Sequence, residues 1–322
     1  MLLNDFITSQ GYNCILGNVY NSMKYFQVDV LEQDLFFWFS PFDGDKNLPE
    51  VFEELYVDKG ECGWKEFIKK SLNDGHPVLT SINPEVLPYF KVKVGDSSVK
   101  HYINIIGIDE DRKQLYVSDS YIPTYIPSTY EGWVDYSEIS NLDIGNCWHL
   151  KSELLMYFHN NFGEETINNF TLTSIIKKLS SFLKKDGDNH KTSGIDNLRM
   201  MSKNVRNDIV NVNYNEIFKL LAGIRLNVIN PLIYLIKVFE RCPNEYSEWT
   251  ERLNTLVNDH WEIVNIKLVK FALAHKKLDA DMILNQIEKA IEFEKNILSD
   301  ILKQLSWARS SGNNELTDLL KR

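Results

Sequence analysis

The pattern of apolar and polar residues changes character near residue 150. Before that point, short β-rich runs such as "HPVLTSI" (76–82), "YINIIGI" (102–108) and "KQLYVSDSY" (113–121) are separated by polar turns. Runs of this length and composition are typical of strands. Because only the polar segment "DEDRK" (109–113) joins the second run to the third, we expect these two to form an antiparallel hairpin.

From about residue 153 onward, apolar positions instead recur at intervals of three and four, which places them on one face of a helix. One such stripe consists of Trp249, Leu253, Leu256, Val257 and Trp261, and another of Ile283, Ile287, Ala290, Ile291, Ile297, Leu298, Ile301, Leu302 and Leu305. The fold class predicted is therefore α+β: a mixed front half over 1–152 and an all-helical region over 153–322.

Cys14 stands immediately before an apolar run of helical spacing, "ILGNVYNSMKYF" (15–26). We expect a helix here, with Cys14 in its first turn and Asn13 near the N-cap. The unpaired N–H groups and partial positive charge of a helix N-terminus favour a thiolate and can bind a developing oxyanion. Two interpretations remain open from position alone: a nucleophile, or a small apolar residue of the core.

A cysteine nucleophile needs a base, and the base needs an orienting group. His101 begins the first strand of the predicted hairpin and Asp119 lies at the end of the second, so antiparallel pairing would bring them side by side. The alternatives are a surface histidine and a turn-forming aspartate. His149, two residues after Cys147, is the second candidate for the base.

Charge and cysteine content narrow the functional classes. A formal net charge of -10 and a pI near 5.3 argue against nucleic-acid binding, which requires a basic face. The four cysteines contain no CxxC pair, so we expect neither a metal site nor a disulfide framework. The most apolar window (228–239) is too short to cross a membrane. With no secretory pattern in the first ten residues, we expect a cytoplasmic protein without a membrane partner.

Four stretches together resemble a known family: "NCILGNVYNSMKYF" (13–26), "SLNDGHPVLTSINPEVLPYF" (71–90), "KHYINIIGIDEDRKQLYV" (100–117) and "SDSY" (118–121). In this order they resemble the N-terminal domain of the butirosin-biosynthesis-H family. That family is in turn similar to the bacteriocin-processing cysteine peptidases, which have a papain-like fold. The resemblance covers roughly residues 10–150 and implies a papain-like catalytic domain over 1–152, with an N-terminal helix packed on an antiparallel sheet.

The resemblance also implies an activity and its residues. Cys14 would be the nucleophile, His101 the base and Asp119 its orienting group, in an acyltransferase of natural-product biosynthesis. Such an enzyme takes an acyl chain from the phosphopantetheine arm of a carrier protein and passes it to a small-molecule amine, without a bound cofactor. Papain-like peptidases place an oxyanion-hole glutamine about six residues before the cysteine, whereas Gln10 stands four before Cys14.

Several roles remain open. Asn13, Tyr121 and Tyr125 are candidates for the substrate pocket, and packing is the alternative for the two tyrosines. A thioesterase or cysteine peptidase would use the same triad with a different acceptor or donor, and a non-catalytic helical scaffold is the alternative outside enzymes. The helical region over 153–322 has three candidate roles: covering the active site, binding the carrier protein or forming a homodimer.

Overall fold

The chain divides into two compact units, Met1–Leu35 with Asn47–Phe162, and Phe36–Lys46 with Gly163–Arg322. The predicted boundary between residues 152 and 153 lies outside the residues that the structure describes. The structure is a computed structural model, and it describes residues 1–28, 30–39, 56–58, 63–90, 100–122, 128–136, 144–151, 164–183, 195, 198–200, 202–204, 221, 223–241, 243–274 and 280–310.

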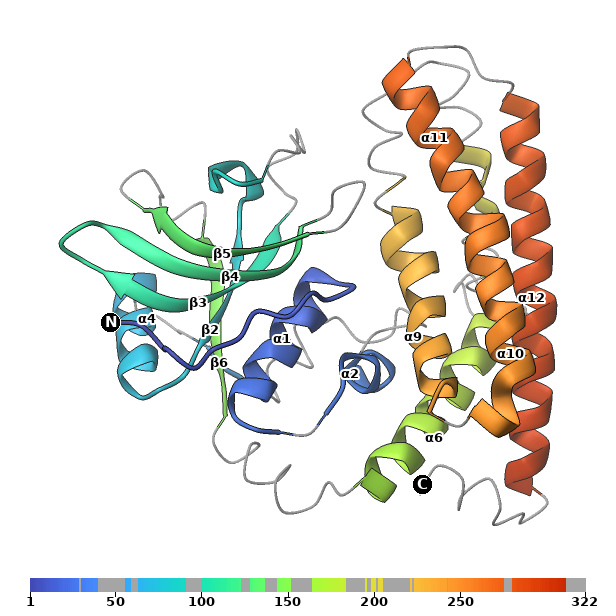
Figure 1. The fold of residues 1–322 in the computed structure, drawn as a ribbon, viewed down its shortest axis with the longest axis horizontal. Helices are drawn as coiled ribbons and strands as arrows, with labels where there is room; N and C mark the ends of the chain where they lie inside the picture. Colours follow the sequence, from blue (N-terminus) through green and yellow to red (C-terminus); the bar gives the residue numbers. More distant parts are fainter. Residues whose placement is uncertain are drawn as a thin grey trace, which may run out of the picture. The chain divides into compact units, whose positions relative to one another are not determined.

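The first unit is built on a six-stranded sheet with the order β1-β6-β2-β3-β4-β5, in which all neighbouring strands are antiparallel (Figure 1). The predicted hairpin is confirmed, because β3 pairs with β4 across the turn at 110–113. The strands are β1 (Tyr56–Asp58), β2 (Val78–Ile82), β3 (His101–Asp109), β4 (Gln114–Ile122), β5 (Ser128–Asp135) and β6 (Ile144–Leu150).

Helices cover both faces of this sheet. Helix α1 (Cys14–Tyr25) packs on β3 and β4, where the side chain of Asn104 reaches it. Helix α4 (Trp64–Asn73) packs on β2, β3 and β6, where Ile103 lies in its apolar cluster. Since successive side chains of a strand point to opposite faces, α1 and α4 lie on opposite sides of the sheet. The described residues up to Phe90 also include a short helix α2 (Glu32–Phe39) and a 3-10 turn η1 (Pro84–Val86).

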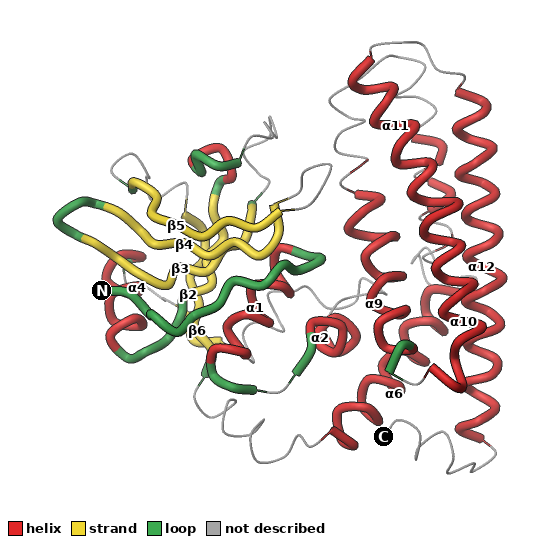
Figure 2. Tube along the Cα trace, in the orientation of Figure 1, coloured by secondary structure: helices red, strands yellow, loops and turns green. Residues whose placement is uncertain are grey.

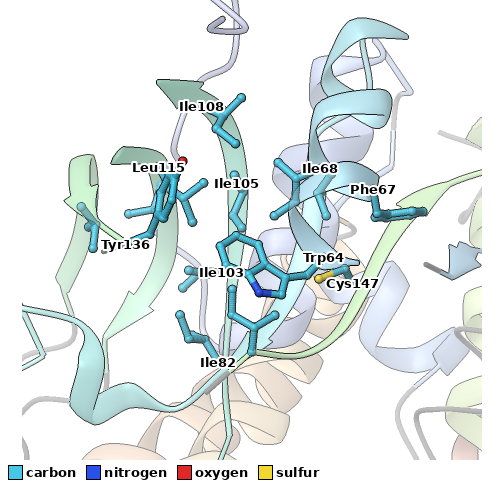
Figure 3. Packing of buried hydrophobic residues seen from close by; sticks show 14 of the residues in the cluster. Trp64, Phe67, Ile68, Ile82, Ile103, Ile105, Ile108, Leu115, Tyr136 and Cys147 are labelled. Atoms are coloured by element: carbon cyan, nitrogen blue, oxygen red, sulfur yellow. The ribbon is translucent and has the colours of Figure 1, made fainter. Parts of the chain in front are cut away.

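The core of this unit lies between α4 and the sheet. Figure 3 shows Trp64 and Ile68 facing the isoleucines of β3, with Cys147 of β6 among them. Full burial of one such aliphatic side chain contributes about 1.5–3 kcal/mol relative to leaving it exposed. The buried members are Trp64, Phe67, Ile68, Leu72, Val78, Ile82, Leu87, Ile103, Ile105, Ile108, Leu115, Val117, Val134, Tyr136, Ile144 and Cys147.

The second unit contains only helices among its described residues (Figure 2). Besides the end of α2 from Phe36, its helices include α6 (Glu164–Leu183), η2 (Arg225–Ile229), α9 (Asn230–Phe239), α10 (Pro243–Thr255), η3 (Leu256–Trp261), α11 (Glu262–Ala274) and α12 (Ala280–Ser310); η2 and η3 are π-helical.

Both predicted apolar stripes lie in this unit and are buried, except for the partly exposed Leu302. The prediction of an α+β half followed by helices is confirmed. None of the described helices combines the length and hydropathy that crossing a bilayer requires.

Candidate active site

Cys14 lies in the first turn of α1, as predicted. Asn13 adopts an extended N-cap conformation (φ −149°, ψ 137°), and its side-chain oxygen accepts from Ile15 N at 2.8 Å and Leu16 N at 3.2 Å. The N–H of Cys14 itself has no partner among the described residues, and the thiol is half-buried. A free donor therefore lies beside an accessible sulfur at the positive end of the helix.

The segment before α1 is tied to the sheet and to α2. Gly11 N donates to Ser120 O of β4 at 2.9 Å, and Tyr12 N donates to the buried carboxylate of Glu32 at 2.9 Å. These bonds satisfy backbone donors that the turn leaves unpaired. They hold the start of α1 against the end of β4, where Asp119 lies.

His101 and Asp119 form a buried pair. The imidazole Nε2 lies 2.7 Å from Asp119 Oδ2, and the two residues are 4% and 0% exposed. Because Asn104 pairs with Ser118 in the β3–β4 ladder, the start of β3 lies beside the end of β4. The other carboxylate oxygen, Oδ1, accepts from Tyr121 N at 3.1 Å, which fixes the carboxylate plane.

The charge state of His101 follows from its neighbours. Burial lowers the pKa of His101, but the charge of Asp119, the hydrogen bond to it and the contact with the Cys14 side chain together raise that pKa to about 10. Nε2 is occupied by Asp119, so Nδ1 is the ring atom available to the sulfur. At neutral pH the His101 ring is therefore protonated next to the Cys14 side chain.

Aromatic side chains from the turn after β2 cover this pair. The Phe90 ring lies 4.9 Å from the His101 ring, and Tyr89 stacks on Tyr130 with centroids 3.8 Å apart. Burial, followed by the charge of Asp119, raises the pKa of Tyr89 well above its ordinary value, so its hydroxyl stays neutral. Removing water strengthens the pair because the local dielectric falls. Tyr89 and Phe90 belong to the segment 71–90 that carries the family resemblance, but nothing local in the sequence predicts that they cover the His101–Asp119 pair.

The other residues predicted for the site differ from the triad in exposure and in the contacts they make. Gln10 is exposed, Asn13 uses its side-chain oxygen to cap α1, and Tyr121 is buried next to Asp119. Tyr125 lies outside the described residues. The oxyanion and pocket roles of these four residues stay predictions.

His149 lies in a different environment from His101. Its Nδ1 lies 2.7 Å from Ser71 Oγ, its ring stacks on Phe67, and burial is the main cause that lowers its pKa to about 4. Cys147 is fully buried in the core, where Thr80 Oγ1 donates to its sulfur at 3.6 Å. In the structure, His149 therefore pairs with Ser71, and Cys147 is a packing residue. Cys62 and Cys242 lie outside the described residues.

Among the described residues, no group of three or more His, Cys, Asp or Glu side chains is arranged to hold a metal ion.

Gly17 sets how closely α1 approaches β4. A Cβ at this position would lie 2.5 Å from Ser120 Oγ and 3.0 Å from Gly11 Cα, closer than side chains tolerate. We expect Gly17→Ala to lower the free energy of unfolding by about 1–3 kcal/mol, as measured by urea denaturation, because α1 must shift outward. Gly63→Ala is the matched control, because a Cβ there meets nothing within 4 Å. Equal stability of the two variants would contradict this account.

A comparison with known protein families gives a match in the middle of the first unit. Residues 55–143 match the family model described as the Peptidase_C39 like family. This segment is similar to papain-like cysteine peptidases. The match covers less than half of the 322 residues; it includes His101 and Asp119 and lies downstream of Cys14. The papain-like α+β fold predicted for this half agrees with it, whereas the match does not reach the narrower butirosin-type family. No curated protein matches the chain significantly.

Proposed function

We propose that the chain is a cysteine-dependent acyl-transfer enzyme that works through an acyl group held on Cys14. The observation that carries the proposal is the buried His101–Asp119 pair, 2.7 Å long, in contact with the Cys14 side chain at the start of α1. A thiol, a histidine and a group that orients the histidine are the parts that nucleophilic acyl transfer requires.

The first half-reaction forms the acyl-enzyme. The Cys14 thiolate attacks the acyl carbon, and the N–H of Cys14 donates to the oxygen on which negative charge develops. The bond to the leaving group breaks as the protonated His101 delivers its proton to it. The products are a thioester on Cys14 and a neutral imidazole, which Asp119 keeps oriented through Nε2.

The second half-reaction returns the enzyme to its first state. An incoming nucleophile attacks the thioester carbon on Cys14, and the neutral His101 takes its proton. Collapse of the tetrahedral intermediate releases the thiolate and the acylated product. The imidazolium formed in this step restores the ion pair, since Asp119 favours the charged ring.

For donor and acceptor we propose a thioester and an amine, with a phosphopantetheine arm of a carrier protein as donor. Support comes from the resemblance of the four motifs to the butirosin-biosynthesis-H family. A thiol is also a good leaving group, so the first step needs little proton donation from His101. The carrier protein would be the macromolecular partner. A homodimer and a cytoplasmic location remain expectations from the sequence.

Peptide cleavage is the second candidate, and the match of residues 55–143 to the Peptidase_C39 like family favours it. An amine leaving group must be protonated as it departs. His101, with a pKa of about 10, keeps its proton at neutral pH and can supply it. Water as the acceptor would make the enzyme a peptidase or a thioesterase, so the acceptor and the leaving group separate the candidates.

Intact-mass spectrometry tests the proposal. After incubation with an N-acetylcysteamine acyl thioester, we expect one acyl mass on the protein, located at Cys14 by peptide mapping. Adding a primary amine should then release an amide faster than the acid forms in buffer alone. Cys147→Ala should be acylated like the wild type, since Cys147 is buried in the core. Acylation of Cys14→Ala at the wild-type rate would overturn the proposal and favour the scaffold alternative.

A further inference from the structure

Asn18 is a fully buried amide in the middle of α1, one turn after Cys14. A carboxamide at such a site costs free energy unless its donors and acceptor are satisfied, and asparagine is a poor residue for a helix interior. A packing role alone would be met better by an aliphatic side chain. The bonds that Asn18 makes therefore need an explanation.

The Asn18 carboxamide bonds to the backbone of Cys14 and of the residues that follow His101 and Asp119. Its Nδ2 donates to the carbonyl oxygen of Cys14 at 2.7 Å and to that of Tyr102, the residue after His101, at 2.8 Å. Its Oδ1 accepts from the N–H of Ser120, the residue after Asp119, at 3.3 Å. One side chain thus joins α1, β3 and β4 at the points from which the three candidate side chains project.

A second set of bonds holds Asn18 itself. Asn104 Nδ2 donates to the backbone carbonyl oxygen of Asn18 at 2.8 Å, and Ser22 Oγ donates to the same backbone oxygen at 3.1 Å. Ser22 Oγ also lies 3.2 Å from Asn104 Oδ1. All three residues are buried, so these bonds form in a medium of low dielectric and hold the helix backbone at Asn18 in place.

We propose that Asn18 is a positioning residue, which sets the separation of the Cys14 sulfur from the His101–Asp119 pair. The inference rests on the proposed function, because it assigns Asn18 to the same site. Asn18 acts through backbone atoms and touches none of the reacting groups. A displacement of about 1 Å between reacting groups is enough to lower a rate roughly a hundredfold, so a tie of this kind has a large effect.

Two substitutions distinguish the hydrogen bonds from Asn18 to β3 and β4 from its hydrogen bond to Cys14 within α1. Asn18→Asp keeps the shape and the acceptor of Asn18 but lacks the two N–H donors to Cys14 O and Tyr102 O. Asn18→Ser keeps a bond within the helix, because a serine hydroxyl can donate to the carbonyl four residues earlier, but it is too short to reach β3 and β4.

Asn21→Ala is the matched control. Asn21 lies on the same helix, is 1% exposed, and its carboxamide makes two bonds of 3.2 and 3.1 Å, both to the backbone of Ser9. Substituting it removes buried hydrogen bonds from α1 without touching the backbone beside Cys14, His101 or Asp119. Any general loss of stability should therefore be similar in the Asn18 and Asn21 variants.

The readout is the rate of iodoacetamide alkylation at Cys14 from pH 5 to 10, followed by peptide mass spectrometry, with thermal unfolding in parallel. For the Asn18 variants we expect an alkylation rate at pH 7 roughly 10- to 100-fold below that of the wild type. We also expect the rate to depend on pH as it does for an ordinary thiol. Asn21→Ala should keep the wild-type profile even if it unfolds at a lower temperature.

Each outcome decides a separate point. If the wild type shows a reactive Cys14 and either folded Asn18 variant keeps that profile, the positioning role is wrong and the proposed function stands. If Asn21→Ala loses reactivity as much as the Asn18 variants do, the effect is general destabilisation and the positioning role is again wrong. If Cys14 of the wild type reacts like an ordinary thiol, the proposed function fails together with the inference that rests on it.

Discussion

Replacing His101 by alanine should lower the rate at which Cys14 is acylated by roughly a thousandfold, the midpoint of what a positioned acid-base group contributes. Two effects combine. The larger one is that the thiolate loses the cation whose pKa of about 10 keeps it paired at neutral pH; the smaller one is that the leaving thiol loses a proton donor of which it needs little. Stopped-flow or quenched mass measurements of single-turnover acylation, with a saturating acyl thioester, would give this rate directly.

His149→Ala is the discriminating control for this prediction. His149 is the second histidine that the sequence offers as a base, yet its ring bonds Ser71 and stacks on Phe67. We expect this variant to lose stability and to keep the wild-type acylation rate at temperatures where it is folded. A large loss of acylation in His149→Ala, with His101→Ala close to the wild type, would exchange the two assignments.

Asp119→Ala should lower the free energy of unfolding by about 3–5 kcal/mol, which is more than we expect for Gly17→Ala. The substitution removes the partner of a buried histidine that is 4% exposed and leaves Tyr121 N without its acceptor. Urea denaturation at pH 6, well below the pKa of about 10 of His101, measures the difference. Asp109→Ala is the matched control at the other end of β3. Its ion pair with Arg112 is exposed and 3.8 Å long, so we expect a change below about 1 kcal/mol.

The pH dependence of the same difference follows from the raised pKa of His101. Its ordinary value is 6.5 and its value in the fold is about 10. A raised pKa contributes stability that is fully present below 6.5 and is lost as the pH rises through 10. The gap between wild type and Asp119→Ala should thus be widest near pH 6 and narrow steadily from pH 7 to pH 10. A gap that widens over this range would contradict the assignment of the ion pair.

Much of the first unit could be predicted from local patterns. The run 102–108, the polar turn and the run 113–121 predict a hairpin because strands repeat every two residues and turns are polar. Antiparallel pairing then places His101 beside Asp119, since the start of one strand meets the end of the next. The start of α1 at Cys14 follows as directly, because Asn13 is a good N-cap residue.

Other features of the site depend on contacts that no local pattern encodes. Phe90 and Tyr89 belong to a turn after β2, and only the fold brings them over His101 and Asp119. The same holds for His149, whose distance from the site depends on β6 pairing with β1 and β2 rather than with β3. The sequence offers His149 as a second base because it lies two residues after Cys147.

Periodicity, capping and hairpin geometry act over a few residues, so local patterns predict the kinds of elements, the helix start at Cys14 and a hairpin that brings His101 beside Asp119. The face of the sheet that receives α1, and the bonds that hold the three residues together, depend on long-range contacts. Asn18 and Tyr102 are 84 residues apart in the chain, and their hydrogen bond requires α1 to lie close to the sheet, as it does where Gly17 meets Ser120. Such a bond depends on the relative placement of whole elements, which side-chain periodicity leaves undetermined.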